Sequence, residues 1–107
     1  MSIQQYILDH HLNAMRIHGK RIGADRSGDR VIAVHNPYTG ETIGSVPKAT
    51  LEEIRDAFAV SRRYKPNLSR YERAAILNRA AAIAERRKAE VAALICAEAG
   101  LCMKDAL

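Results

Sequence analysis

SRYERAAILNRAAAIAERRKAEVAALICAEAG, residues 69–100, determines the architecture that this sequence predicts. Ser69 and Glu72 form the S-x-x-E pattern of a capping box, in which each side chain accepts a hydrogen bond from the other residue's backbone N–H. The residues that follow contain no proline or glycine and are rich in good helix formers. Gly100 suits the left-handed residue that ends many helices. The stretch therefore predicts one helix of about 30 residues, roughly 45 Å long at 1.5 Å per residue.

This predicted helix has two faces that need neighbours. One face carries large and small apolar residues at helical spacing: Ile76, Ala80, Ile83, Ala84, Val91, Leu94 and Ile95. The opposite face carries small residues: Ala75, Ala82, Ala89, Ala93 and Cys96. Arg87 falls within the apolar stripe, where we expect it to snorkel or to pair with an acid outside this chain. The rest of the chain is too short to cover both faces, which predicts a longer polypeptide or an oligomer.

A β-hairpin precedes the long helix. Residues 30–35 and 41–46 are apolar and rich in β-branched residues, as strands are, and NPYTG at 36–40 separates them. Asn36 can accept backbone hydrogen bonds in such a turn, and Gly40 can take the strained position. A second, shorter hairpin is predicted over residues 15–22.

Thr50 and Glu53 repeat the capping box and predict a helix that ends near Tyr64, ahead of Pro66. Residues 1–14 form a leader with a short amphipathic helix, and residues 15–107 form the hairpin and helices. The fold class is an α+β fragment, a hairpin followed by two capped helices. Another helix starts at residues 103–107 and stops with no cap and no glycine, which predicts a truncated or processed chain.

The composition favours a folded cytoplasmic protein. The 107 residues are 48% hydrophobic and carry a net charge of +5. We find no signal peptide and no apolar run of the ~20 residues that a membrane span needs. A basic cluster, defined as Arg62, Arg63, Lys65, Arg70 and Arg73, flanks the turn between the two helices. It suits anion capture, but we favour a solvated edge that pairs with Glu72 and a partner domain, and we do not expect nucleic acid.

The residues alone reveal no active site. The glycines match neither a dinucleotide-binding nor a Walker pattern, and no G-x-S-x-G or H-E-x-x-H occurs. Cys96 lies inside the predicted helix, and Cys102 has no histidine nearby in sequence. We therefore predict neither a nucleophile nor a zinc site nor a disulfide.

Several segments together resemble the N-terminal region of the aldehyde dehydrogenase superfamily. These are MRIHGK at 15–20, VHNPYTGETIGSVP at 34–47, ATLEEIRDAF at 49–58, ERAAIL at 72–77 and EAG at 98–100. They stand in the family's order and cover nearly all of residues 15–107. YKPNLSRYER at 64–73 and GLCMKD at 100–105 resemble the phosphonoacetaldehyde dehydrogenase branch.

The resemblance implies a parent enzyme of the α/β aldehyde dehydrogenase fold, with a Rossmann-type cofactor domain, a catalytic domain and an oligomerisation flap. Such enzymes oxidise an aldehyde to a carboxylic acid with NAD or NADP. Their nucleophile, general base and nucleotide-binding segments lie downstream of this region, so no catalytic or cofactor-binding residue is carried over. The segment is then structural and inactive alone. Its expected partners are the remainder of the same polypeptide, further copies of the enzyme and a small aldehyde substrate.

One site is implied by the resemblance. Some members of the family hold a monovalent cation with carbonyl groups just before N-P and with an acid two residues before the helix-ending glycine. The matching positions are Val34, His35 and Glu98. Oxygen ligands suit such an ion.

Two other functions compete with this interpretation. The first is a small basic helix-turn-helix that binds nucleic acid through residues 50–64 and the long helix, joined by a four-residue linker. Tyr71 and Ala74, near the start of the second helix, are poor readers of base edges. The second is a stand-alone oligomerisation module.

Overall fold

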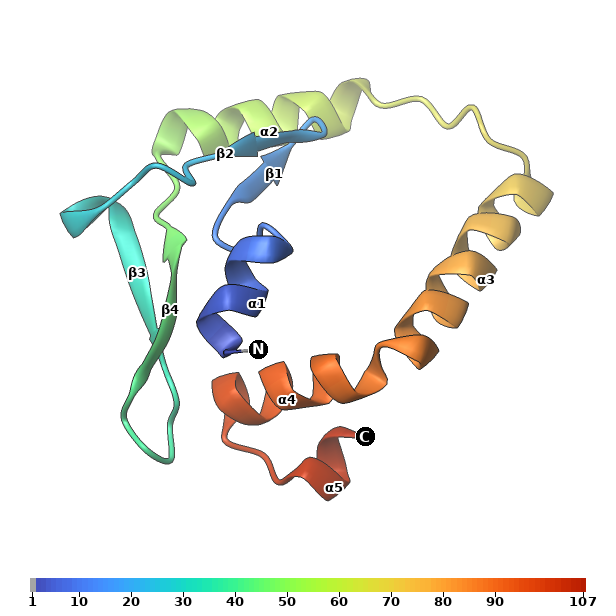
Figure 1. Ribbon diagram of the computed structural model, residues 1–107. Coiled ribbons are helices and arrows are strands. Elements are labelled where there is room, and N and C mark those ends of the chain that lie inside the picture. The colour runs from blue at the N-terminus through green and yellow to red at the C-terminus, as the bar shows by residue number, and fades with distance from the viewer. Residues whose placement is uncertain (1) are drawn as a thin grey trace.

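The computed structural model describes residues 2–107 and is a small mixed α/β unit with two separate two-stranded antiparallel sheets (Figure 1). Its elements are α1 (Ile3–Asp9), β1 (Met15–Ile17), β2 (Lys20–Ile22), β3 (Val31–His35), β4 (Thr42–Pro47), α2 (Leu51–Arg63), α3 (Arg70–Arg86), α4 (Lys88–Ala99) and α5 (Met103–Ala106), with a 3-10 turn at Gly28–Arg30. The predicted α+β class and the short helix in the leader are confirmed.

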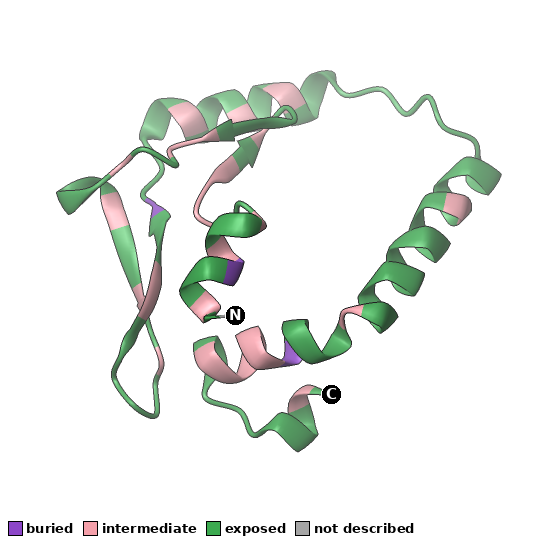
Figure 2. Ribbon diagram, in the orientation of Figure 1, coloured by how far each residue is buried: buried purple, intermediate pink, exposed green. Residues whose placement is uncertain are grey.

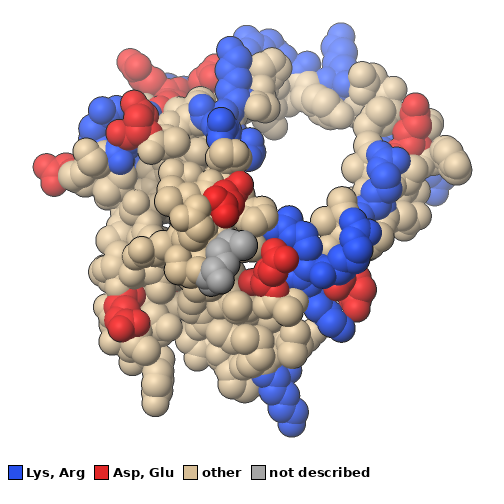
Figure 3. Space-filling view, in the orientation of Figure 1, with Lys and Arg blue, Asp and Glu red and all other residues tan. Residues whose placement is uncertain are grey.

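The elements form an open curve rather than a packed globule. From α2 the chain runs through an extended linker, residues 64–69, into α3, and α4 then turns back toward α1 and the β3–β4 hairpin (Figure 1). Of the described elements, α4 is the only one that α3 contacts substantially. The space-filling view shows an opening through the molecule that α2, the linker, α3 and α4 enclose (Figure 3).

Both predicted hairpins are present. In the first, His18 and Gly19 have φ angles of 52° and 75°, as a tight turn between twisted strands requires. In the second, Val31 pairs with Pro47 and Val34 with Gly44, and the register shifts between Val34 and His35. β4 thus includes Pro47, one residue beyond the predicted end.

The turn of the β3–β4 hairpin and the two capping boxes form as predicted. The Asn36 side-chain oxygen accepts hydrogen bonds from the backbone N–H groups of Tyr38 and Thr39 at 2.8 and 3.1 Å. The Thr50 hydroxyl accepts from the Glu53 N–H at 3.2 Å, and the Ser69 hydroxyl accepts from the Glu72 N–H at 3.2 Å. Each glutamate carboxylate in turn accepts a hydrogen bond from the backbone N–H of its N-cap residue.

The prediction of one helix of about 30 residues is wrong. α3 ends at Arg86 and α4 begins at Lys88, because Arg87 has φ −107° and ψ 11°, outside the helical region. The Arg87 side chain contacts Tyr6 of α1 and Glu90 of α4. Its acidic partner, Glu90, is therefore in this chain and not outside it.

The buried core is small. The hydrophobic residues that are buried are Tyr6, 7% exposed, and Ala92, 0% exposed (Figure 2). Large apolar residues remain exposed along the two helices: Leu51, Ile54 and Phe58 of α2, and Ile76, Leu77 and Ile83 of α3. Among residues 2–107, no helix combines the length and the apolar character that a membrane crossing demands.

Candidate functional site

A groove of about 170 Å³ lies where α1, the β3–β4 hairpin and α4 meet. α1 can approach β4 closely because residue 44 is a glycine: a Cβ there would lie 2.9 Å from Cδ1 of Ile7. The groove is lined by Ile7, Leu12, Val34, Ile43, Gly44, Ser45, Val46, Leu94 and Glu98. Among these lining residues Glu98 is the one with a charged side chain. A ligand in the groove would therefore meet apolar side chains and one carboxylate.

The structure brings together two of the three residues predicted for a cation. Val34 and Glu98 line the same groove, although they lie on β3 and α4. His35 is exposed and does not line it; its Nδ1 lies 3.1 Å from the Thr42 hydroxyl. Within residues 2–107, no group of three or more His, Cys, Asp and Glu side chains is placed to hold a metal ion. A shell that uses backbone carbonyl groups stays a prediction.

The approach of β3 to the end of α4 depends on Gly100. Its φ of 68° is left-handed, and a Cβ at this position would lie 2.9 Å from Cγ of Pro37. The turn between β3 and β4 therefore packs directly on the C-terminus of α4. Two segments that the sequence singled out separately, NPYTG at 36–40 and EAG at 98–100, are neighbours in the fold.

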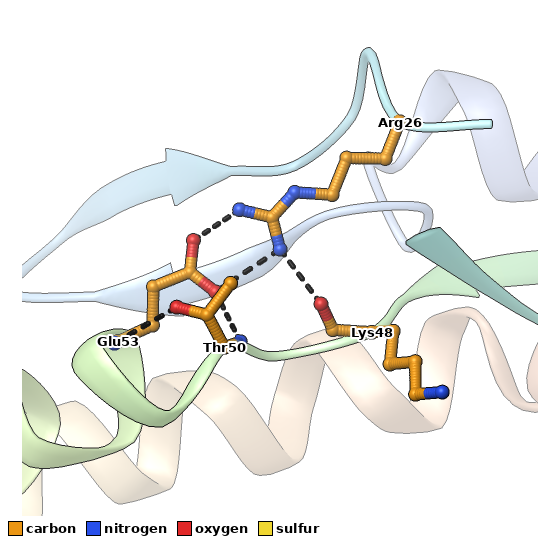
Figure 4. Close-up of polar contacts among 4 residues, drawn as sticks. All are labelled: Arg26, Lys48, Thr50 and Glu53. Carbon is orange, nitrogen blue, oxygen red and sulfur yellow. Dashed lines mark hydrogen bonds and ion pairs between the residues drawn. The ribbon is translucent and has the colours of Figure 1, made fainter. Parts of the chain in front are cut away.

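A polar cluster of Arg26, Lys48, Thr50 and Glu53 fixes the start of α2 (Figure 4). Arg26 Nη1 donates to the Lys48 carbonyl at 2.8 Å and to Glu53 Oε2 at 3.0 Å, and Nη2 donates to Glu53 Oε1. The Thr50 N–H donates to Glu53 Oε2 at 2.8 Å. The hydrogen bonds from Arg26, and next that from Thr50, lower the pKa of Glu53 from 4.5 to about 2.

This cluster is structural, because both carboxylate oxygens of Glu53 are occupied by donors and neither is free to accept a substrate proton. The sequence analysis missed Arg26, which lies in a segment predicted only as a loop. The sequence did hold a hint of this pair. Arg26 stands in a short loop, and capping uses only one carboxylate oxygen of Glu53, which leaves the other able to accept a hydrogen bond. Only the fold shows that the two meet.

The basic cluster does not pair with Glu72 as expected. The Glu72 carboxylate accepts from the Ser69 N–H at 2.7 Å, which lowers the pKa of Glu72, and it caps α3. Arg73 Nη1 donates to the Leu68 carbonyl at 2.7 Å. In residues 2–107 the ion pairs are Arg26–Glu53, Arg87–Glu90 and Lys88–Glu85, so the basic cluster contributes none.

The two cysteines lie in α4 and just after it. Cys96 is half-buried in α4, and Cys102 is exposed. The Cys102 thiol donates to Asp105 Oδ2 at 3.0 Å. Among the hydrogen bonds of residues 2–107, none joins a cysteine to a histidine, which is the usual base for a catalytic thiol.

Residues 24–107 match the model of the aldehyde dehydrogenase family. The chain belongs to this family. The match covers the β3–β4 hairpin and α4, which form two sides of the groove, and both members of the Arg26–Glu53 pair, and it leaves α1 outside. Membership overturns the helix-turn-helix alternative, and the fold agrees: α2 and α3 diverge from the linker (Figure 1), whereas the two helices of a helix-turn-helix pack on each other.

The chain is similar to curated dehydrogenases along most of its length. It is 39% identical over 93 residues to 1-pyrroline-5-carboxylate dehydrogenase 2 of Halalkalibacterium halodurans, which covers 84% of this chain and 18% of that protein. It is 37% identical over 87 residues to the 1-pyrroline-5-carboxylate dehydrogenases of Staphylococcus aureus and Oceanobacillus iheyensis, covering 78% of this chain and 16% of each relative. The chain thus spans less than a fifth of the length of these relatives. No solved structure matches the chain significantly.

Proposed function

We propose that this chain is the N-terminal part of an NAD(P)+-dependent aldehyde dehydrogenase, and that its role is structural. The observation that carries the proposal is the family match over residues 24–107, combined with apolar faces of α2 and α3 that this chain leaves uncovered. In the proposed enzyme these helices pack against the remainder of the same polypeptide. The opening enclosed by α2, α3 and α4 (Figure 3) leaves room for that packing.

The proposal assigns the chemistry to other parts of the enzyme. Glu53 is occupied by Arg26 and Thr50, and within residues 2–107 no hydrogen bond joins Cys96 or Cys102 to a histidine. No glycine-rich phosphate loop occurs in the sequence, so NAD or NADP would be held by residues outside this segment. The proposed enzyme is cytoplasmic and a homo-oligomer. If it binds a monovalent cation, Val34, His35 and Glu98 are the residues of this chain that would contribute.

Two compounds are candidates for the substrate of the proposed enzyme. Segments 64–73 and 100–105 resemble the phosphonoacetaldehyde branch, while the relatives at 37% to 39% identity are named for 1-pyrroline-5-carboxylate. The relatives' names do not bear out the phosphonoacetaldehyde branch, which stays a prediction. Both compounds are small and anionic. Phosphonoacetaldehyde is itself an aldehyde, whereas 1-pyrroline-5-carboxylate is a cyclic imine that becomes an aldehyde when water opens the ring.

The test compares the 107-residue chain with the full-length product of its gene. Each is incubated with NAD+ or NADP+ and one of the two substrates, and reduced nicotinamide is followed by absorbance. We expect turnover by the full-length product and none by the chain. Turnover by the chain alone would contradict the structural role. A full-length product without dehydrogenase activity, or a reading frame that stops after Leu107, would contradict the proposal that this chain is part of a dehydrogenase.

The exposed apolar face of α3 also suits a stand-alone oligomerisation module. This second candidate predicts that the 107-residue chain forms one defined oligomer. Sedimentation velocity across a range of concentrations distinguishes it from the first, which predicts a chain that stays monomeric or associates without a fixed stoichiometry.

A further inference from the structure

A surface pocket lies between the turn of the β1–β2 hairpin and the last turn of α2. Its volume is about 120 Å³, and it is lined by His18, Val60, Arg63 and Tyr64. β1 packs along α2 (Figure 1), and the left-handed φ of 52° at His18 belongs to the tight turn of this hairpin. The pocket thus brings together side chains from two segments that are distant in sequence.

The lining of this pocket offers hydrogen-bond donors. The Arg63 guanidinium presents a planar fork of N–H groups, the Tyr64 hydroxyl can donate, and so can a ring nitrogen of His18. Within residues 2–107, none of these three side chains takes part in a hydrogen bond or an ion pair. Val60 supplies an apolar wall, and no Asp or Glu belongs to the lining. The pocket therefore suits a ligand that accepts hydrogen bonds.

The surroundings of the pocket are strongly basic. Residues 10–24 contain three Lys or Arg and residues 57–71 contain four, and neither stretch contains an Asp or Glu. These seven positive charges exceed the net charge of +5 of the whole chain, so the remaining residues carry more acids than bases. Figure 3 shows Lys and Arg side chains over the hairpin and the end of α2, at the top of the view. A concentration of one sign of charge attracts ions of the opposite sign.

Stabilisation of the helix dipole explains only part of this arrangement. Arg62 and Arg63 stand in the last turn of α2, where cations are favourable. That role does not explain why His18 and the basic residues of the hairpin lie beside them. Two carbonyl groups at this helix end are already occupied, since the Tyr64 N–H donates to those of Val60 and Ser61 at 3.1 and 3.3 Å. An anion there would meet free donors and fewer free acceptors.

We propose that this pocket binds a tetrahedral oxyanion, either inorganic phosphate or the phosphoryl group of a small metabolite. The fork of Arg63 can bind two of its oxygens at once, and Tyr64 and His18 can donate to the others. The volume has room for several water molecules, which suits a group of this size. The inference goes beyond the proposed function and does not depend on it, because this chain supplies the whole lining.

Titration of the 107-residue chain with inorganic phosphate, followed by NMR, tests the proposal. Sodium chloride holds the ionic strength at about 0.15 M, so that distant charges are screened. We expect the backbone amide signals of residues 17–19 and 60–64 to shift together and to saturate. A second titration uses methyl phosphate. Equal affinity supports the site and assigns it the phosphoryl group of a larger molecule, whereas binding of inorganic phosphate alone supports the site and assigns it the free ion.

Substitutions of Arg63 separate this site from the overall charge of the chain. Arg63→Gln should weaken phosphate binding about tenfold, because charge-assisted hydrogen bonds are lost. Arg63→Lys keeps the charge without the fork and should cause a smaller loss. Arg79→Gln on α3 removes the same charge outside the pocket and is the matched control, so its affinity should stay within about twofold of the parent. Calorimetry of the full-length gene product with the same substitutions repeats the comparison in the larger protein.

Two results would overturn the proposal. Shifts that spread over the basic residues without saturating, or equal losses in Arg63→Gln and Arg79→Gln, would show that only the overall charge attracts phosphate. Phosphate that causes neither a shift in the chain nor heat in the full-length product would show that the pocket binds no oxyanion. Dehydrogenase activity is measured separately, so a failure of this site is distinguishable from a failure of the proposed function.

Discussion

Arg26 and Glu53 form an ion pair that joins the loop after β2 to the first turn of α2 across 27 positions of sequence. Their side chains are 8% and 18% exposed, so water screens this pair less than a surface pair. The same carboxylate closes the capping box of α2 through the Thr50 N–H. One side chain thus stabilises both a loop and a helix end.

The stability of the chain should depend on pH through Glu53. Its pKa is lowered from 4.5 to about 2 in the folded chain, so the folded state favours the charged carboxylate. This contribution is complete above pH 4.5 and is lost as pH falls from 4.5 toward 2. Urea denaturation between pH 2 and 6, followed by circular dichroism, should show the midpoint fall over this window.

Glu53→Gln should lower the midpoint at pH 6 and flatten its decline at acid pH. Glu85→Gln is the matched control, because Glu85 and Lys88 form an exposed pair one turn apart and such pairs contribute little. A Glu53→Gln variant that keeps the decline of the parent would show that other carboxyl groups cause it.

Gly100→Ala should destabilise the chain for two separable reasons. The left-handed φ of 68° costs a residue with a Cβ about 1–2 kcal/mol, and the new Cβ would press on Pro37. Gly40→Ala is the matched control, because Gly40 has a φ of 75° and open space around its Cβ position. Urea denaturation should therefore show a larger loss of unfolding free energy for Gly100→Ala than for Gly40→Ala. Equal losses would show that the contact with Pro37 does not add to the destabilisation.

Elements with a local cause could be predicted from the sequence. Both capping boxes, the NPYTG turn and the His18-Gly19 turn depend on a few adjacent residues, and all four are present. The family could be predicted as well, since its motifs are local strings in a fixed order. The break at Arg87 could not, because residues 84–91 contain no proline or glycine that would mark it.

The candidate site, too, could be predicted from the sequence only in part. The sequence singled out Val34 and Glu98 through the family resemblance, and both line the groove. His35 follows Val34 directly on β3 and does not line that groove, because successive side chains of a strand point to opposite faces. The Arg26–Glu53 pair was missed because capping explained Glu53 completely, and nothing local assigned Arg26 a partner.

Ser69→Ala should weaken the start of α3 by about 1 kcal/mol. The substitution removes the hydroxyl that accepts the Glu72 N–H at 3.2 Å. Hydrogen exchange of the amides in the first turn of α3 reports the change directly. Ser61→Ala, inside the exposed last part of α2, is the control and should leave those amides unaffected. Equal exchange in both variants would mean that the capping box does not stabilise α3.

Ile76→Ala on α3 should destabilise the full-length gene product much more than the 107-residue chain. In the chain Ile76 is 44% exposed, so the variant should stay within about 0.5 kcal/mol of the parent. If the rest of the enzyme covers this face, the same substitution leaves a cavity and costs about 2–5 kcal/mol. Arg79→Ala should be nearly neutral in both proteins. Thermal or urea denaturation of the four variants measures this contrast, and an equally small effect of Ile76→Ala in both would show that α3 stays uncovered in the enzyme.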